Sequence, residues 1–198
     1  MQSKILIISF SLRDNSQSQK VAEYIQSIGG KNYNYLDLFE NPLPFWDEGV
    51  WNNDPKWQDL LNPIKAMINE ADGFVLVVPE YGGSPSPSYF NFMLIFGSIL
   101  NHKPALITTV SNARGGAYPI SSIRSSGYKN TKINFVPDQL IIRNVESVLN
   151  QEVDNFNQED VYIRQRIEYT LKILDVYTTN FVNIRSQLQL DPKYGNGM

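Results

Sequence analysis

The segment Ser9–Ser16 combines the kinds of side chain that bind a phosphate group. Its serines supply hydroxyl donors, Arg13 supplies a full positive charge, and Ser16 can cap a following helix. Backbone N–H groups and the dipole at a helix N-terminus attract anions, and an arginine adds charge-assisted hydrogen bonds. The segment matches neither G-x-G-x-x-G nor a Walker A loop, which excludes the usual dinucleotide and P-loop sites. Its plainer interpretation is a polar turn with an ordinary helix cap.

Two further segments are rich in small residues and could border a flat ligand. Pro79–Pro87 places two glycines directly after Tyr81, so backbone amides can approach a ring closely while an aromatic side chain borders it. Ser111–Gly116 combines Arg114 with two more glycines. Each segment alone could be a rigid turn or a polar loop. Together with the serine-rich segment, they predict a site for a planar, phosphorylated ligand if the fold brings them to one place.

Alternating strands and helices are predicted to bring the three segments together. Apolar, β-branched runs predict buried strands at 5–9, 33–38, 73–78 and 104–110, and a fifth at either 133–135 or 140–142. Helices are expected over 16–28, 56–70, 88–101, 117–129 and from 157 onward. This alternation predicts a doubly wound, five-stranded parallel sheet in the order 2-1-3-4-5, with helices on both faces. Ligands bind such sheets beyond the carboxyl ends of the first and third strands, where two of the segments fall.

The residue counts exclude several kinds of chemistry. The chain has 198 residues with no cysteine and one histidine, His102. Disulfides, thiolate nucleophiles, iron–sulfur clusters and two-histidine zinc motifs are therefore excluded. The net charge of −3 gives no indication of a nucleic-acid or anionic-membrane partner. The length favours one domain over residues 1–190, with a flexible tail over 191–198.

Two features favour a cytoplasmic protein. The apolar start at 5–8 is soon followed by Arg13 and Asp14 and lacks a small-residue cleavage site, so it does not fit a signal peptide. The longest strongly apolar stretch, Phe92–Phe96, is far too short to span a bilayer. We therefore expect a soluble protein without a membrane segment.

A serine hydrolase is the chief rival enzyme class. Gly82–Ser86 approaches the G-x-S-x-G pattern of a nucleophile elbow. The base of such a triad would have to be His102, which directly precedes the strand at 104–110 and so falls at the amino edge of the sheet, opposite the serines. A triad is therefore disfavoured, and His102 is interpreted as a turn residue without a catalytic role. Glu80 could be a buried acid, but a carboxylate that accepts from backbone amides or meets a partner subunit is favoured.

Several segments resemble the NAD(P)H-dependent FMN reductase family, which is flavodoxin-like and includes quinone, azo-dye and chromate reductases. The pattern Ser11-Leu-Arg-x-x-Ser16 resembles its phosphate-binding motif, and Asp37–Asp47 resembles the segment after its second strand. Ala71–Ser84 is similar to its third strand and flavin loop. Further matching positions are Asn91, Lys103, Pro104, Gly115 and Gly116. The resemblance spans residues 4–118.

The resemblance implies FMN as the cofactor and NADPH or NADH as the electron donor. Hydride passes from nicotinamide to flavin N5 in such enzymes and electrons go on to a quinone, azo compound, metal ion or free flavin, so no catalytic side chain is required. The FMN phosphate would be held by Ser11, Arg13 and Ser16, and Ser18 would belong to the same cofactor site. The ring and ribityl chain would be lined by Pro79, Glu80, Tyr81, Gly82, Gly83 and Ser84. The pyrimidine end of the ring would be flanked by Ser111, Arg114, Gly115 and Gly116. The acceptor is expected to be bordered by Tyr81, Trp46 and Trp51.

The chain departs from the family pattern at four positions. Phe10 stands in place of a glycine before the first motif serine, and Gly82 in place of an asparagine in the flavin loop. Phe90 and Leu94 stand in place of a lysine and an acidic residue in the following helix. That helix, Ser88–Asn101, has almost no polar face. We expect it to be buried against a second subunit in a homodimer or tetramer, rather than under the loop at 39–57.

Two alternatives to a reductase stay open on the sequence alone. A flavin-binding electron carrier or sensor would use the same fold without a nicotinamide site, although flavodoxins tend to be strongly acidic around the flavin and this chain is not. A degenerate flavodoxin-like binding protein without reductase activity would have lost FMN, and the departures at Phe10 and Gly82 keep that alternative open.

Overall fold

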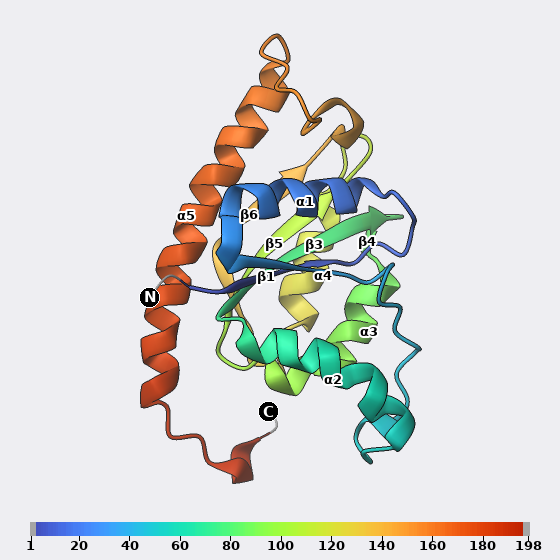
Figure 1. Cartoon of the computed structure of the whole chain (residues 1–198), viewed down its shortest axis with the longest axis vertical. Coiled ribbons are helices and arrows are strands. Elements are labelled where there is room, and N and C mark those ends of the chain that lie inside the picture. The colour runs from blue at the N-terminus through green and yellow to red at the C-terminus, as the bar shows by residue number, and fades with distance from the viewer. Residues whose placement is uncertain (1–2, 196–198) are drawn as a thin grey trace.

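A parallel β-sheet lies at the centre of the molecule, in a computed structural model that describes residues 3–195 (Figure 1). Its strands are β1 (Ile5–Ser9), β2 (Tyr33–Asp37), β3 (Gly73–Tyr81), β5 (Pro104–Val110) and β6 (Asn134–Ile142). They lie in the order β2-β1-β3-β5-β6, and all neighbours on this path are parallel. The predicted order 2-1-3-4-5 and the flavodoxin-like class are therefore confirmed.

Helices cover both faces of the sheet (Figure 1). The α-helices are α1 (Gln17–Gly29), α2 (Pro55–Glu70), α3 (Pro87–Phe96), α4 (Tyr118–Ser126) and α5 (Gln158–Gln187). Short 3-10 helices lie at Gly30–Asn32, Glu48–Val50, Gly97–Ile99, Val145–Ser147 and Pro192–Tyr194. Because strand side chains alternate, β1 contributes to two cores. Ile5 and Ile7 pack with α1 and α5, whereas Leu6 and Ile8 pack with α2, α3 and α4.

A sixth, very short strand was not predicted. β4 (Ser84–Pro85) folds back antiparallel onto the end of β3, so that Tyr81 pairs with Ser84. The two turn residues between them, Gly82 and Gly83, have φ of +57° and +79°. A two-residue turn of type I′ needs a positive φ at both central positions, which glycine adopts without strain. The two glycines therefore form a tight hairpin at the carboxyl edge of the sheet.

The sequence pattern allowed two positions for the last parallel strand, 133–135 and 140–142, and the structure has one strand that covers nearly all of both. β6 runs from Asn134 to Ile142, and its pairing with β5 shifts so that Ala105 faces Phe135 while Ile107 faces Gln139. The extra residues lie around Pro137, which cannot donate to the hydrogen-bond ladder. This irregularity divides one strand into two apolar runs and explains why the pattern indicated two candidate positions for it.

Helix α1 begins where the sequence predicts. Ser16 is its N-cap, and the Ser16 hydroxyl accepts a hydrogen bond from the Gln19 N–H at 3.0 Å. The Gln19 side chain points toward the helix and donates to Glu23 at 2.9 Å, so it does not complete a capping box with the Ser16 backbone, although the spacing of Ser16 and Gln19 allows one. The cap thus fixes the start of the helix that follows the serine-rich loop.

Helix α3 is buried mainly within the chain itself. Most of its aromatic side chains are fully buried, and among its large apolar residues Phe90 and Leu94 are the exposed ones, at 39% and 55%. The segment after β2 covers the rest: Asn91 accepts from the Trp46 N–H and donates to the Pro44 carbonyl, both at 2.8 Å. The exposed apolar face is therefore smaller than the sequence predicts, because the loop at 39–57 packs over it.

No helix within residues 3–195 is long and apolar enough to cross a membrane. A single domain over residues 1–190 stays a prediction. Of the predicted tail at 191–198, residues 192–194 form a 3-10 helix, and 196–198 lie outside the described residues.

Candidate functional site

The three polar loops meet at the carboxyl edge of the sheet, as the topology predicts. They enclose a cavity of about 220 Å³ beyond the ends of β1, β3 and β5. The loop after β1 and the start of α1 contribute Ser11, Arg13, Ser16, Gln17 and Ser18. The end of β3 contributes Pro79, Glu80 and Tyr81, and the end of β5 and the loop after it contribute Val110 and Asn112.

The loop after β1 has the donor set that a phosphate needs. The Ser11 hydroxyl is buried, accepts from the Arg13 N–H at 3.3 Å and lies 3.4 Å from the Tyr81 hydroxyl. Arg13 is exposed and has no carboxylate within ion-pair distance among residues 3–195, so its charge is available to a ligand. The side-chain oxygen of Gln17 is buried without a partner in the described chain. A hydroxyl-bearing phosphate ester fits this cavity, because the phosphate meets donors and a hydroxyl would satisfy Gln17.

Glu80 fixes the third loop against the second. Its carboxylate accepts a hydrogen bond from the Gly116 N–H, and a Cβ at Gly115 would lie 2.5 Å from the same carboxylate oxygen. The Gly116 carbonyl in turn accepts from the Thr109 hydroxyl at 2.6 Å. Glycine at 115 allows this close approach, and Gly116 has φ of +99°. The structure thus supports the interpretation of Glu80 as a carboxylate satisfied by a backbone amide.

Phe10 lies in the core, away from the phosphate loop. Its ring is fully buried and meets the rings of Tyr89 and Phe92 edge to face, both at 5.4 Å between centroids. The Phe10 carbonyl accepts from the Ser88 hydroxyl at 2.5 Å. The departure from glycine therefore does not fill the loop. Strand alternation was the signal for this placement, because Phe10 continues the series of Leu6 and Ile8 on one face.

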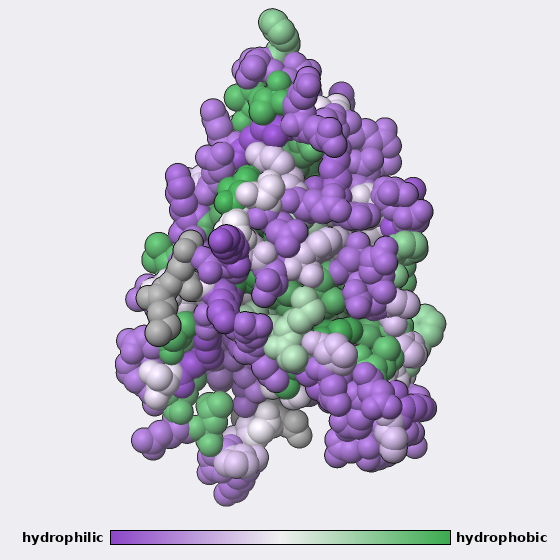
Figure 2. All heavy atoms as spheres, viewed as in Figure 1, coloured by the Kyte–Doolittle hydropathy of each residue, from purple (hydrophilic) through white to green (hydrophobic). Residues whose placement is uncertain are grey.

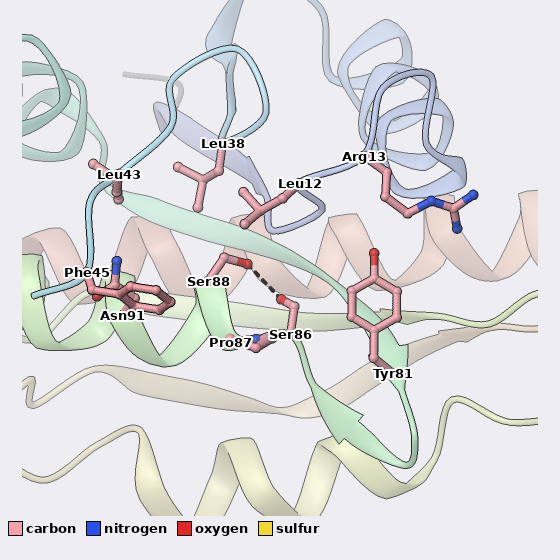
Figure 3. Close-up of a pocket in the computed structure, with 10 residues that line it drawn as sticks. All are labelled: Leu12, Arg13, Leu38, Leu43, Phe45, Tyr81, Ser86, Pro87, Ser88 and Asn91. Atoms are coloured by element: carbon pink, nitrogen blue, oxygen red, sulfur yellow. Dashed lines mark hydrogen bonds between the residues drawn. The ribbon is translucent and has the colours of Figure 1, made fainter.

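A second cavity, of about 420 Å³, adjoins the first on the side of α3 (Figure 3). Arg13 and Tyr81 line both cavities, and the Tyr81 hydroxyl is directed toward the loop that carries Arg13. Apolar side chains form much of the second cavity: Leu12, Leu38, Leu43, Phe45 and Pro87.

Three polar residues of this second cavity are already engaged by the chain. Both amide atoms of Asn91 bond to the backbone of the loop after β2. The Ser88 hydroxyl reaches the Phe10 carbonyl and lies 2.9 Å from the Ser86 hydroxyl (Figure 3). A ligand in this cavity would therefore find free polar groups mainly at the end formed by Arg13 and Tyr81.

The two tryptophans expected to border an acceptor do not line either cavity. Trp46 is half-buried against the core, Trp51 is 68% exposed, and their rings meet at 4.6 Å. Leu43 and Phe45 of the same segment line the second cavity instead. Phe45, which lies between Pro44 and Trp46, was not among the residues predicted to border the acceptor.

The remaining residues predicted to bind the cofactor do not line the first cavity. Gly82, Gly83 and Ser84 form the β3–β4 hairpin. Ser111, Gly115 and Gly116 belong to the loop that Glu80 holds, and Arg114 lines a different cavity between β6 and α5.

His102 lies at the opposite edge of the sheet from all of these residues. It directly precedes β5, has φ of +56°, and its N–H donates to the Lys132 carbonyl at 2.9 Å. Burial, with Lys132 and Arg185 nearby, lowers the pKa of His102. The structure therefore gives no base to the serines after β3, which argues against a hydrolase triad.

Comparisons with known proteins agree with this arrangement. The family model for NADPH-dependent FMN reductase matches residues 3–147. An NADPH azoreductase from Bacillus sp. (strain OY1-2) is 28% identical over 144 residues, which cover 70% of this chain and 76% of that protein. An NAD(P)H-dependent FMN reductase of Schizosaccharomyces pombe is 29% identical over 120 residues, which cover 57% of this chain and 60% of that protein.

Solved structures support the fold. FerB, an NAD(P)H:(acceptor) oxidoreductase from Paracoccus denitrificans, superposes with a TM-score of 0.61 at 18% identity, covering 91% of this chain and 96% of that one. An NAD(P)H:quinone oxidoreductase from Methanothermobacter marburgensis has a TM-score of 0.60 at 12% identity, and the match covers 85% of this chain and 97% of that one. Because the family model spans most of the sheet and all three loops, the chain belongs to the NADPH-dependent FMN reductase family and is an oxidoreductase that uses FMN and NAD(P)H.

Proposed function

We propose that this protein reduces small, planar aromatic acceptors, quinones and azo compounds above all, at a flavin held on the carboxyl edge of the sheet. The observation that carries the proposal is the apolar cavity of about 420 Å³, which shares Arg13 and Tyr81 with the polar cavity. A volume of this size is typical of sites for small organic ligands.

In this proposal the polar cavity and its surroundings hold FMN. Ser11, Arg13, Ser16 and Ser18 bind its phosphate at the start of α1. The β3–β4 segment, from Pro79 to Ser84, borders the ribityl chain and the ring together with Ser111, Gly115 and Gly116. When bound, FMN supplies the redox chemistry between NAD(P)H and the acceptor. The chain positions the cofactor, limits access of water and shapes the acceptor site.

The walls of the second cavity favour an apolar aromatic acceptor over a metal ion. Leu12, Leu38, Leu43 and Phe45 offer apolar contacts, whereas a metal ion needs carboxylate, imidazole or hydrated surroundings. Arg13 and Tyr81 can donate hydrogen bonds to a polar end of the acceptor. The names of two relatives, an azoreductase and a quinone oxidoreductase, agree with this substrate class.

A panel of acceptors tests the proposal. Protein loaded with FMN is mixed with NADPH or NADH and then with menadione, methyl red, ferric citrate or free FMN, and kcat/KM is measured for each. We expect the quinone and the azo dye to give the highest values. Protein that stays yellow with both nicotinamides would favour an electron carrier, and colourless protein that does not bind added FMN would favour a degenerate binding protein. Higher kcat/KM for the iron salt or free FMN would overturn the proposed acceptor class.

Assembly as a homodimer through α3 is a further part of the proposal. Phe90 and Leu94 lie one helical turn apart and are both exposed. Figure 2 shows apolar side chains gathered over the part of the molecule that carries α3. Members of the family are often oligomeric, which adds support. A cytoplasmic location stays a prediction of the sequence.

A further inference from the structure

A groove outside the proposed flavin site runs between the edge strand β6 and helix α5, which lie side by side (Figure 1). One part is a cavity of about 410 Å³ lined by Arg114, Arg143, Asn144, Glu159 and Tyr162, among others. An adjoining cavity of about 330 Å³ shares Arg143 and Tyr162 with it. The two cavities therefore form one continuous groove along the edge of the sheet.

The groove offers positive charge that the chain itself does not neutralise. Arg114 and Arg143 are exposed, and neither has a carboxylate within ion-pair distance in the part of the chain that is described. By contrast, Arg166 at the far end of the groove is paired with Asp138. Two unpaired guanidinium groups in one groove suit a phosphate group, which they can bind through several hydrogen bonds.

The groove also offers a surface for a nucleobase. Tyr162, from the first turns of α5, is 64% exposed and lines both parts of the groove, so one face of its ring can stack on a base. The Glu159 carboxylate accepts from the Asn144 side chain at 3.2 Å and can accept from a sugar hydroxyl as well. A stacking ring, free arginines and a sugar-binding carboxylate together are the groups that bind a phosphorylated nucleoside.

A single short loop separates this groove from the proposed flavin site. Asn112 lines the polar cavity and Arg114 lines the groove, so at most about 7 Å of chain divides them. Arg143 fixes the same loop by donating to the Gly115 carbonyl at 2.9 Å. A molecule with one end at the flavin site could therefore cross the loop and place its other end in the groove.

We propose that the groove between β6 and α5 binds the phosphoadenosine half of NADPH, with Arg114 and Arg143 at the 2′-phosphate and Tyr162 against the adenine. The assignment rests on the proposed function, because it places the electron donor beside the flavin. It makes the groove the determinant of selectivity for NADPH over NADH.

The test uses FMN-loaded protein and two probes that lack nicotinamide, 2′-phospho-ADP-ribose and ADP-ribose, with Kd measured by isothermal titration calorimetry. We expect the 2′-phosphorylated probe to bind about tenfold more tightly than ADP-ribose. Arg114→Gln should weaken the phosphorylated probe by about tenfold, since it removes one charge-assisted contact, and should affect ADP-ribose less. Tyr162→Ala should weaken both probes to a similar degree. Lys172→Gln, which removes an exposed positive charge elsewhere on α5, is the matched control and should change neither.

Several results would overturn the assignment. The first is equal affinity for the two probes. The second is an unchanged Kd of Arg114→Gln for 2′-phospho-ADP-ribose, and the third is a loss of FMN affinity in that variant without any loss of affinity for the probes. Circular dichroism and the FMN Kd of each variant show whether the fold and the flavin site are intact. The titration contains no electron acceptor, so a negative result here does not change the outcome of the acceptor panel. In the same way, a panel that contradicts the proposed acceptor class does not change the measured affinities of the probes.

Discussion

Arg13 lines both cavities at the carboxyl edge, and its side chain is free of acidic partners in the described structure. Arg13→Ala should therefore lower FMN affinity without unfolding the protein. The loss of a charge-assisted phosphate contact is worth roughly 1.5–3 kcal/mol, or about 10- to 150-fold in Kd, measured by quenching of flavin fluorescence. Lys172→Ala controls for the change in net charge. An unchanged Kd in Arg13→Ala would place the phosphate elsewhere.

Phe45 lines the apolar cavity, although Trp51 of the same segment was expected to border the acceptor. It is 83% exposed and lines the apolar cavity, whereas Trp51, from the same segment, is 68% exposed and does not. Phe45→Ala should raise KM for a quinone by roughly five- to tenfold with little change in kcat, because it removes apolar contact with the acceptor. Trp51→Ala should leave KM nearly unchanged. The opposite ranking in steady-state kinetics would restore the tryptophan as the acceptor wall.

At the level of single residues, the predicted polar residues Ser11, Arg13 and Ser16 line a cavity at the expected edge of the sheet, whereas the predicted tryptophans line neither cavity; the binding roles of all of them stay predictions. Ser11, Arg13 and Ser16 are identified by their chemistry and by their place after a strand. Which apolar side chain of a long loop faces a cavity depends on how that loop packs. Here two hydrogen bonds from the Asn91 side chain hold the loop in its packed position. Asn91 lies in α3, so the sequence of the loop itself does not predict these bonds.

Among the structural elements, the β3–β4 hairpin depends on the backbone conformation of Gly82. Its φ is +57°, and a Cβ there would meet nothing within 4 Å. Gly82→Asn should therefore keep the melting temperature within about 3 °C and bind FMN at least as well, because asparagine tolerates this conformation. Gly82→Val should lose about 1–2 kcal/mol of stability, because a branched side chain is strained at positive φ. Equal melting temperatures for the two variants, measured by differential scanning fluorimetry, would contradict the turn geometry.

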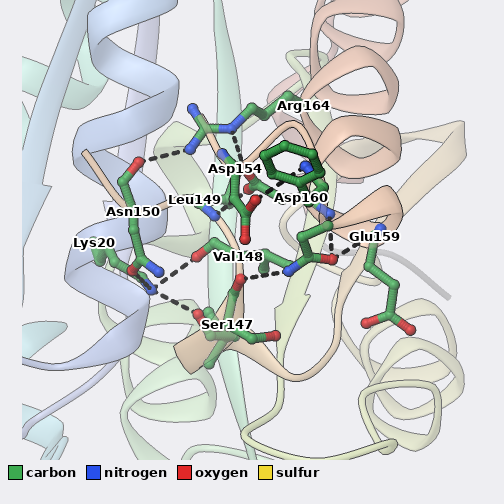
Figure 4. Close-up of polar contacts among 12 residues, drawn as sticks. Lys20, Ser147, Val148, Leu149, Asn150, Asp154, Glu159, Asp160 and Arg164 are labelled. Carbon is green, nitrogen blue, oxygen red and sulfur yellow. Dashed lines mark hydrogen bonds and ion pairs between the residues drawn. The ribbon is translucent and has the colours of Figure 1, made fainter. Parts of the chain in front are cut away.

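Helix α5 is joined to the loop after β6 by a buried carboxylate (Figure 4). Asp160 accepts from the Leu149 N–H at 2.7 Å, from the Arg164 side chain at 2.9 Å and from the Asp154 N–H at 3.2 Å. Burial alone would raise the pKa of Asp160, but these hydrogen bonds outweigh it and hold the pKa below its ordinary value. The ionised carboxylate therefore stabilises the folded state, and this contribution is lost as the pH falls through the folded-state pKa.

Asp160→Asn should lower the free energy of unfolding by roughly 2–4 kcal/mol at pH 7, since it weakens several charge-assisted hydrogen bonds at once. Urea unfolding measures this change, and the difference from the wild type should shrink in strongly acidic solution. Glu152→Gln removes a negative charge from an exposed position of the same loop and should have little effect. A similar loss in both variants would mean that general electrostatics, and not this cluster, stabilises the region.

The order of the elements was predictable because burial on both faces leaves a clear apolar signal in a parallel strand. Two elements have weaker signals: β4 was not predicted, and the sequence pattern allowed two positions for β6. β6 is interrupted at Pro137, and β4 is a two-residue strand that depends on a glycine turn. The interruption of β6 and the turn before β4 both depend on the local backbone conformation, which a pattern of apolar residues does not predict.

On the scale of the whole molecule, the proposed homodimer would bury the exposed apolar side chains of α3. Phe90 and Leu94 are 39% and 55% exposed. Purified protein should therefore have twice the chain mass of 22.6 kDa in size-exclusion chromatography with light scattering. The double variant Phe90→Glu/Leu94→Glu should run as a monomer, because it places like charges on both sides of the contact.

The matched control for assembly is the double variant Tyr169→Glu/Val176→Glu on α5. These two side chains are 56% and 62% exposed, so the change in charge and in apolar surface is similar. If α3 forms the interface, this control stays dimeric while the α3 variant dissociates, and both keep the circular dichroism of the wild type. A monomeric wild type would exclude the dimer, and dissociation by the α5 variant alone would move the interface to the long C-terminal helix.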